Sequence, residues 1–228
     1  MAERPPAITA VVPVLDGAAF LEASLRSLLA GTVAPAEIIV IDDGSKDDSA
    51  AVADAVPGVQ VIRQPHAGVA TARNRGVAAA HHDLVVFHDA DDLRTEEGLA
   101  AQVAALQHTP SAGCVIGRQQ LLDEAPISGD AGRPWWAEAG REGLAAVGPM
   151  LVRREAFERV GGFSEGVHLE DVDWLVRARA AGVEVLLIDE PVIVRRAHSA
   201  NRSADLVRTR ADLLDILRRR MTGSRPPR

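Results

Sequence analysis

Short apolar runs rich in β-branched residues recur along the first half of this sequence, and each is followed by acidic residues. The clearest runs are 8–14, followed by Asp16; 38–41, followed by Asp42 and Asp43; and 84–87, followed by Asp89, Asp91 and Asp92. Uninterrupted apolar runs of this length are typical of strands that are buried on both faces of a parallel sheet. Because ligands bind at the carboxyl ends of strands in open α/β sheets, the pattern predicts a polar site at that edge.

Helical patterns separate the runs, which predicts an α/β fold with a mostly parallel central sheet flanked by helices. We expect helices over about 20–29, 47–55, 68–79, 96–107, 154–160 and 170–181, and further strands at 59–62, 112–117, 147–152 and 183–188. Ser45, with Asp48 three residues later, resembles a capping box for the second helix. The aperiodic segment 123–143 contains Trp135 and Trp136, which suit either a loop that stacks on sugar or aromatic rings or a loop pinned to the core.

Length and charge narrow the class of protein. The chain has 228 residues, 47% of them hydrophobic, which is enough for one sizeable core and too few for two comfortable domains. Its net charge of −7 argues against a nucleic-acid-binding protein with a broad basic surface. No apolar run approaches the ~18 residues of a membrane span, and no signal segment precedes the first strand. We therefore expect a cytoplasmic protein with no integral membrane segment.

The acidic cluster after the run 84–87 has two interpretations. Asp89 and Asp91 form an Asp-x-Asp pair, which offers the hard oxygen ligands that Mg²⁺ and Mn²⁺ prefer. The cluster equally suits a polar loop before a helix, because Thr95 and Glu97 are residues that start helices. The three aspartates alone leave both interpretations open.

Five motifs, in order, resemble those of the family 2 glycosyltransferases, nucleotide-sugar-dependent enzymes with the GT-A fold. They are Val12–Pro13–Val14 with Asp16, Ile41–Asp42–Asp43–Gly44–Ser45, the basic helix from Gly68 to Gly76, Asp89–Ala90–Asp91–Asp92, and Gly161–Gly162–Phe163 followed by Glu170–Asp171–Val172–Asp173–Trp174. The resemblance implies one GT-A (Rossmann-like) domain over 1–194, with a nucleotide-sugar-binding half at 1–92 and an acceptor-side half at 93–194. Residues 195–228 would form a tail with one helix and a basic end.

The resemblance also implies a role for each motif residue. Donor-binding residues would be Pro13, Val14, Asp16, Asp43, Arg73, Asp89, Ala90 and Asp91, with Asp43 accepting from the base and Arg73 held against base or phosphate. A divalent metal, Mn²⁺ or Mg²⁺, would be bound by Asp91, Asp89 and His198. Catalysis would fall to Asp171 as general base with Glu170, and the acceptor side would hold Trp135, Trp136 and Trp174.

We therefore expect an inverting glycosyltransferase that moves a sugar from a nucleoside-diphosphate donor, UDP-linked by expectation, to a saccharide, peptide or small-molecule acceptor. One alternative is a nucleotidyltransferase, although the stretch 14–18 lacks the Gly-rich triphosphate loop with Arg and Lys that is usual there. Another is a non-catalytic nucleotide-sugar-binding protein, in which Glu170 and Asp171 would be only favourable charges at a helix N-terminus. Retention of both acidic pairs argues against this second alternative.

Overall fold

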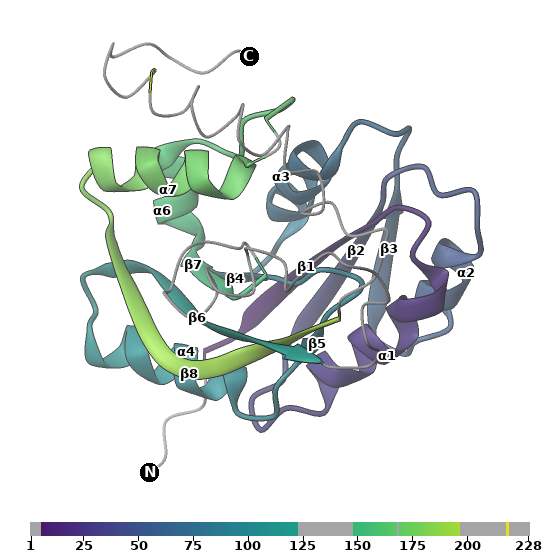
Figure 1. The fold of residues 1–228 in the computed structure, drawn as a ribbon, viewed down its shortest axis with the longest axis horizontal. Coiled ribbons are helices and arrows are strands. Elements are labelled where there is room, and N and C mark those ends of the chain that lie inside the picture. Colours follow the sequence, from purple (N-terminus) through teal and green to yellow (C-terminus); the bar gives the residue numbers. More distant parts are fainter. Residues whose placement is uncertain (1–5, 123–147, 168, 197–217, 219–228) are drawn as a thin grey trace, which may run out of the picture.

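The computed structural model describes residues 6–122, 148–167 and 169–196, and residue 218. Within these ranges eight strands form one curved sheet with helices on both faces (Figure 1). The strands are β1 (Ile8–Val14), β2 (Glu37–Asp42), β3 (Val59–Arg63), β4 (Leu84–Phe87), β5 (Leu93–Arg94), β6 (Ala112–Leu122), β7 (Met150–Arg153) and β8 (Glu184–Arg196). The helices are α1 (Ala18–Leu29), α2 (Ser49–Asp54), α3 (Val69–Ala79), α4 (Gly98–His108), α6 (Arg154–Val160) and α7 (Glu170–Ala180).

The strands follow the order β3-β2-β1-β4-β7-β6-β8-β5 across the sheet. Strand β1 pairs in parallel with β2 and β4, β2 pairs in parallel with β3, and β6 pairs in parallel with β8. Strand β7 is antiparallel to both of its neighbours, and β5 is antiparallel to β8. The predicted α/β fold with a mostly parallel sheet is confirmed. The carboxyl ends of β1, β2 and β4 consequently meet at one edge.

Each face of the sheet packs against its own set of helices. Helices α1, α2 and α4 cover one face, and α3, α6 and α7 cover the other (Figure 1). Leu21, Leu25 and Leu28 recur at helical spacing on α1 and are fully buried against the sheet. All seven residues of β1 are buried, because helices cover this strand from both sides. This two-sided burial is the reason that its sequence is apolar without alternation.

Helix α3 lies unusually close to β1. A Cβ atom built on Gly76 would lie 2.3 Å from Cγ1 of Val11, far inside van der Waals contact. Only glycine at this position lets the helix backbone approach the central strand. The depth of α3 on the sheet is therefore fixed by β1 itself, which matters for the polar side chains that α3 carries.

The structure differs from the sequence-based expectation at four elements. Strand β6, expected to end at residue 117, runs on to Leu122 beside β8. Strand β8 continues past the expected end at residue 188 to Arg196, because residues 188–190 bulge where the register with β6 shifts, and pairing resumes at Pro191. Strand β5 was not predicted, since two residues show no periodicity. The capping box is wrong: α2 begins at Ser49, and the Ser45 hydroxyl instead accepts a hydrogen bond from the Asp16 amide.

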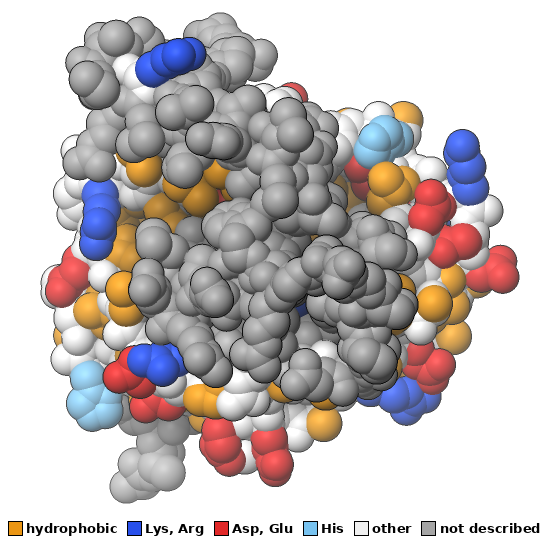
Figure 2. All heavy atoms as spheres, in the orientation of Figure 1, with side chains coloured by type: hydrophobic (Ala, Val, Ile, Leu, Met, Phe, Trp, Pro, Cys, Tyr) orange, Lys and Arg blue, Asp and Glu red, His pale blue; other side chains and the backbone are white. Residues whose placement is uncertain are grey.

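Several expectations concern other parts of the chain. Trp135, Trp136, His198 and the predicted tail helix lie outside the described residues. None of the helices in the described ranges has the length and apolar composition needed to cross a membrane. On the face shown in Figure 2, the described Lys and Arg side chains lie apart from one another among Asp and Glu, without a continuous basic patch.

Candidate active site

Two loops at the edge of the sheet hold each other in place. The amides of Gly17 and Ala18, at the start of α1, donate to the Ser49 hydroxyl and to the Asp47 carboxylate. Asp16 has a left-handed backbone with φ of 51°, and its carboxylate accepts the Lys46 amide at 2.7 Å. The loops after β1 and β2 therefore form one hydrogen-bonded unit. Of the expected donor-binding residues, Pro13 and Val14 are buried in β1, whereas Asp16 is exposed at the edge.

Asp43 is a structural carboxylate. Its oxygens accept hydrogen bonds from the Gln64 amide group, the His66 ring and the backbone amides of Ala67 and Gly68, at 2.7–2.9 Å. Burial by itself raises the pKa of Asp43. The hydrogen bonds lower this pKa by more than burial raises it, so the pKa lies below its usual value. A carboxylate has about four acceptor positions, and all four are filled. Asp43 therefore orders the loop before α3, and the expected hydrogen bond from a nucleotide base to this carboxylate stays a prediction.

The acidic loop between β4 and β5 gathers carboxylates in a small space. A Cβ on Gly148 would lie 3.5 Å from Oδ2 of Asp92 and 3.7 Å from Oδ2 of Asp89, so both carboxylates face this glycine. Asp92 is only 4% exposed, and its Oδ1 atom has no hydrogen-bond partner among the described residues. Burial, followed by the charges of Asp89 and Asp91, raises the pKa of Asp92 well above its usual value. Asp92 was not predicted as a site residue, although it belongs to the same sequence cluster.

Side chains of α1 hold the acidic loop between β4 and β5 in place. The Ser24 hydroxyl donates to the Asp89 carbonyl and accepts from the His88 ring at 2.9 Å, so we assign the proton to Nε2 of that ring. Burial lowers the pKa of His88 to about 3, which keeps the ring neutral. The Ser27 hydroxyl accepts the amide of Arg94 at the other end of the loop. Ala90 is buried within it. Two serines of one helix thus fix both ends of the acidic loop.

The donor set suits a hard divalent cation. Asp89, Asp91 and Asp92 bring three carboxylates to one loop, and Oδ1 of Asp92 has no hydrogen-bond partner among the described residues. A cation would relieve the repulsion between these charges. Within the described ranges, however, no group of three or more His, Cys, Asp or Glu side chains is arranged to hold a metal ion. The expected ligand His198 lies outside those ranges.

Arg73 is a buried bridge between the two halves of the site. Its Nη2 donates to Asp89 and its Nη1 to Glu170, both at 2.5 Å, and only 4% of its side chain is exposed. Burial lowers the pKa of Arg73, but the charges of Asp89 and Glu170 raise it above its usual value, so the guanidinium stays charged. Both Nη atoms are therefore committed to protein carboxylates. In this structure the Arg73 guanidinium bridges Asp89 and Glu170, and the expected contact of Arg73 with base or phosphate stays a prediction.

The first turn of α7 carries two carboxylates with different surroundings. Glu170 is buried against Arg73, whereas Asp171 is partly exposed. Burial, followed by the charge of Glu170, raises the pKa of Asp171 to about 6. A carboxylate of this pKa is ionised at neutral pH and is still basic enough to accept a proton, which is the property of a general base. Asp171 therefore combines access to solvent with the pKa of a general base, whereas Glu170 is buried.

Trp174 belongs to the core. It is fully buried, stacks on Phe157 with ring centroids 5.5 Å apart, and donates its indole N–H to the Gly161 carbonyl. The structure thus shows Trp174 enclosed by the core, and its expected place on the acceptor side stays a prediction. A tryptophan that follows an acidic pair on an amphipathic helix has the same spacing whether it lines a site or fills the core.

Comparison with solved structures identifies the class of fold. The structure resembles the mannosyltransferase PcManGT from Pyrobaculum calidifontis in complex with GDP-Man and Mn²⁺, with a TM-score of 0.78 and 21% identity over 98% of this chain and 66% of that chain. It also resembles S. aureus TarS in complex with UDP-GlcNAc, with a TM-score of 0.72 and 16% identity over 87% of this chain and 61% of that chain. The chain thus spans less than two thirds of either solved chain, and the fold it shares with them is the expected GT-A fold.

Sequence comparison identifies the family. The model of glycosyl transferase family 2 matches residues 9–160, and the chain belongs to this family. An uncharacterized glycosyltransferase of Mycobacterium tuberculosis is 35% identical over 198 residues, which is 80% of this chain and 84% of the relative. GlyG, a glycosyltransferase of Streptococcus pneumoniae, is 26% identical over 90% of this chain and 74% of the relative. The protein is a glycosyltransferase.

Replacing Arg73 should destabilise the fold far more than replacing an exposed arginine. Arg73→Ala removes the guanidinium that pairs with the buried carboxylate of Glu170, which we expect to lower the free energy of unfolding by about 3–5 kcal/mol. The matched control is Arg26→Ala, which removes an exposed Arg–Glu pair at 2.8 Å and should cost at most about 1 kcal/mol. Urea unfolding of both variants measures the difference. Equal losses would contradict the bridge.

Proposed function

We propose that this protein is an inverting, metal-dependent glycosyltransferase that transfers a sugar from a nucleoside-diphosphate sugar, with Asp171 as the general base. The observation that carries the proposal is that Arg73 joins two acidic parts of the structure. One is the carboxylate cluster on the β4–β5 loop, and the other is the start of α7, where Asp171 is partly exposed and has a raised pKa. Family membership supports sugar transfer over the nucleotidyl transfer that the sequence left open.

The two sides of Arg73 would have separate tasks. Asp91, with Asp89 and Asp92, would hold the cation, which supplies charge neutralisation to the departing diphosphate. Asp171 would accept the proton of the acceptor hydroxyl while the oxygen attacks the anomeric carbon on the face opposite the diphosphate. Attack from that face inverts the anomeric configuration. A neutral hydroxyl is a poor nucleophile, and positioned proton transfer of this kind contributes typically ~10²–10⁴-fold.

The donor and acceptor are proposed only by class. The solved structures that resemble this chain include complexes with UDP-GlcNAc and with GDP-Man and Mn²⁺, so they support a nucleotide-sugar donor without favouring one base. Four expectations stay predictions. They are the preference for UDP, a saccharide, peptide or small-molecule acceptor, contact of Trp135 and Trp136 with that acceptor, and the cytoplasmic location. A thermal-shift screen of UDP and GDP, each with and without Mn²⁺, tests the donor class, because a ligand that binds only the folded state raises its melting temperature.

Asp91→Ala should abolish the metal dependence of nucleotide binding. Without this carboxylate the cation loses a ligand, and the diphosphate then faces Asp89 and Asp92 without a cation to offset their repulsion. We expect calorimetry to show tight binding of UDP or GDP with Mn²⁺ in the parent, and weak binding that is insensitive to Mn²⁺ in the variant. Asp54→Asn, which changes an exposed carboxylate on α2, is the control. Parental affinity in Asp91→Ala would show that the metal assignment is wrong.

Asp171→Asn should separate binding from chemistry. Asparagine keeps the size of the side chain and its capacity to cap the helix, but it cannot take a proton. We expect the turnover of UDP-GlcNAc or GDP-mannose to fall by roughly 10²-fold or more, while the Kd for the nucleoside diphosphate stays within about two-fold. Release of the diphosphate measures the turnover. A folded variant that binds the donor and turns over at the parental rate would remove Asp171 from the mechanism.

The pH dependence of turnover should report the same carboxylate. The pKa of Asp171 is raised to about 6, so the group is mostly protonated at pH 5 and mostly ionised at pH 7. Because a base acts in its ionised form, kcat should rise with pH through about 6 and reach a plateau above it. This limb should be absent from the residual rate of Asp171→Asn. A limb of unchanged midpoint in that variant would assign it to another group.

A further inference from the structure

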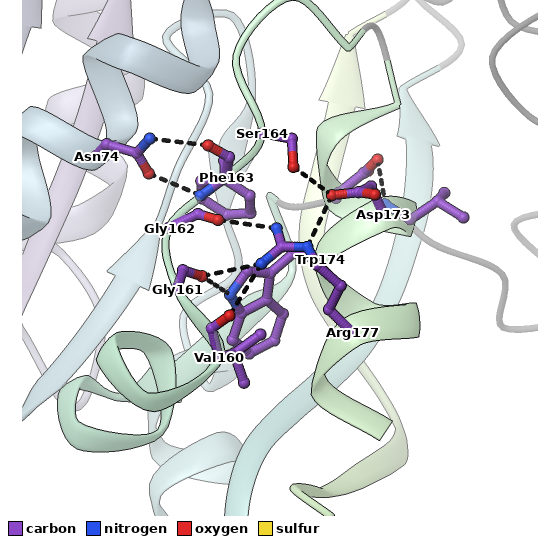
Figure 3. Close-up of polar contacts among 11 residues, drawn as sticks. Asn74, Val160, Gly161, Gly162, Phe163, Ser164, Asp173, Trp174 and Arg177 are labelled. Atoms are coloured by element: carbon purple, nitrogen blue, oxygen red, sulfur yellow. Dashed lines mark hydrogen bonds and ion pairs between the residues drawn. The ribbon is translucent and has the colours of Figure 1, made fainter. Parts of the chain in front are cut away.

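The loop 161–164, which connects α6 to the segment before α7, is tied directly to α3. The side-chain amide of Asn74 donates to the Phe163 carbonyl at 2.9 Å, and its oxygen accepts the Phe163 amide at 2.8 Å (Figure 3). One side chain thus pairs with both polar groups of one residue, as a neighbouring strand would. Figure 3 shows Asn74 reaching this loop from the α3 side, opposite α7.

The loop has a backbone that admits this contact. A Cβ atom on Gly162 would lie 2.6 Å from Oδ1 of Asn74, so a side chain at this position would displace the amide. Gly161 has a φ of 86°, which side chains other than glycine rarely adopt. The two glycines therefore serve the approach of Asn74 and the turn itself.

Helix α7 holds the same loop from the other side. Arg177 donates to the carbonyls of Val160, Gly161 and Gly162 at 2.8–3.2 Å, while its Nε pairs with Asp173 (Figure 3). The Ser164 hydroxyl also donates to Asp173. The indole of Trp174 donates to the Gly161 carbonyl, so three side chains from the first two turns of α7 contact this loop. The loop is consequently a rigid connection between Asn74 and α7.

Helix α3 therefore holds α7 at two places along its length. The first is the Arg73 pair with Glu170, at the very start of α7. The second is Asn74, acting through the loop on Asp173, Trp174 and Arg177 further along. A single contact fixes a point of a helix, whereas two separated contacts also fix its direction. The Arg73 guanidinium lies 5.9 Å from the centre of the Phe163 ring, which joins the two contacts to each other.

We propose that Asn74 is a positioning residue for the general base. It fixes the direction in which α7 begins, and thereby the place of Asp171 relative to the carboxylate cluster beside Asp89. Because Gly76 seats α3 against β1, the reference for this position is the central strand of the sheet. The inference rests on the proposed function for the role of Asp171, but the placement of Asp171 can be measured without any substrate.

The test compares Asn74→Ala with Gln107→Ala, which removes an exposed amide from α4. Carbon NMR of the carboxyl groups gives the titration midpoint of Asp171 in the ligand-free protein; the charged groups that face it are Glu170 on its own helix and Arg73 from α3. We expect Asn74→Ala to move this midpoint down toward the usual value by about half a unit or more, because a less fixed helix start is better solvated. Gln107→Ala should leave it unchanged.

Turnover provides the second measurement. A base displaced by a fraction of an ångström should lower kcat by about 10-fold, while the Kd of UDP or GDP with Mn²⁺ stays within about two-fold. A folded Asn74→Ala that is less stable, but keeps the parental midpoint of Asp171 and the parental kcat, would show that Asn74 is only structural and would overturn the proposal.

A second variant keeps the test decisive if Asn74→Ala does not fold. Asn74→Asp retains the acceptor for the Phe163 amide, loses the donor to the Phe163 carbonyl and adds a negative charge. Because that charge would itself raise the Asp171 midpoint, kcat and the Kd of UDP or GDP with Mn²⁺ are the quantities measured on this variant. Failure of the proposed function has a different signature. A parent that turns over no nucleotide sugar, together with a shifted Asp171 midpoint in Asn74→Ala, would reject the glycosyl-transfer mechanism and support the positioning of Asp171 by Asn74.

Discussion

The buried guanidinium of Arg73 is the interaction on which the arrangement of this site depends. It joins Asp89, at the end of β4, to Glu170, at the start of α7, two carboxylates 81 positions apart in the sequence. A buried charge is tolerated only when partners satisfy it, and removing one partner is more costly than the pair is stabilising. The bridge therefore does little to increase stability over an apolar core, but it defines one position of α7 relative to the sheet.

The acidic residues of the site differ by their surroundings more than by their chemistry. Asp43 is saturated by four hydrogen-bond donors, and its pKa is lowered. Asp92 is buried beside like charges, and its pKa is raised well above the usual value. Asp171 is partly open to solvent beside Glu170, with a pKa of about 6. One residue type thus serves as a structural acceptor, as a candidate cation ligand and as a candidate base, because burial, neighbouring charge and hydrogen bonding act in different proportions.

The rigid part of the structure and the reactive part are connected through α3. Gly76 allows the helix to lie against β1, and the residues just before it, Arg73 and Asn74, reach the loops that carry the acidic groups. The acidic loop is fixed independently from the opposite face of the sheet by Ser24 and Ser27 of α1. The site is therefore built between helices of both layers, each seated on the same central strands, which is the way a fold holds reacting groups in register.

The sequence by itself determined most of the strands, the acidic strand ends and the family, because apolar runs, turn residues and ordered motifs are local features. It did not determine which polar residues face a ligand. Arg73, Asp43 and Trp174 carry motif positions, yet the first is enclosed by two carboxylates, the second is filled by backbone and side-chain donors, and the third is stacked in the core. Those contacts join residues far apart in the chain, so only the tertiary structure decides whether a polar side chain stabilises the fold or is available to bind a ligand or react.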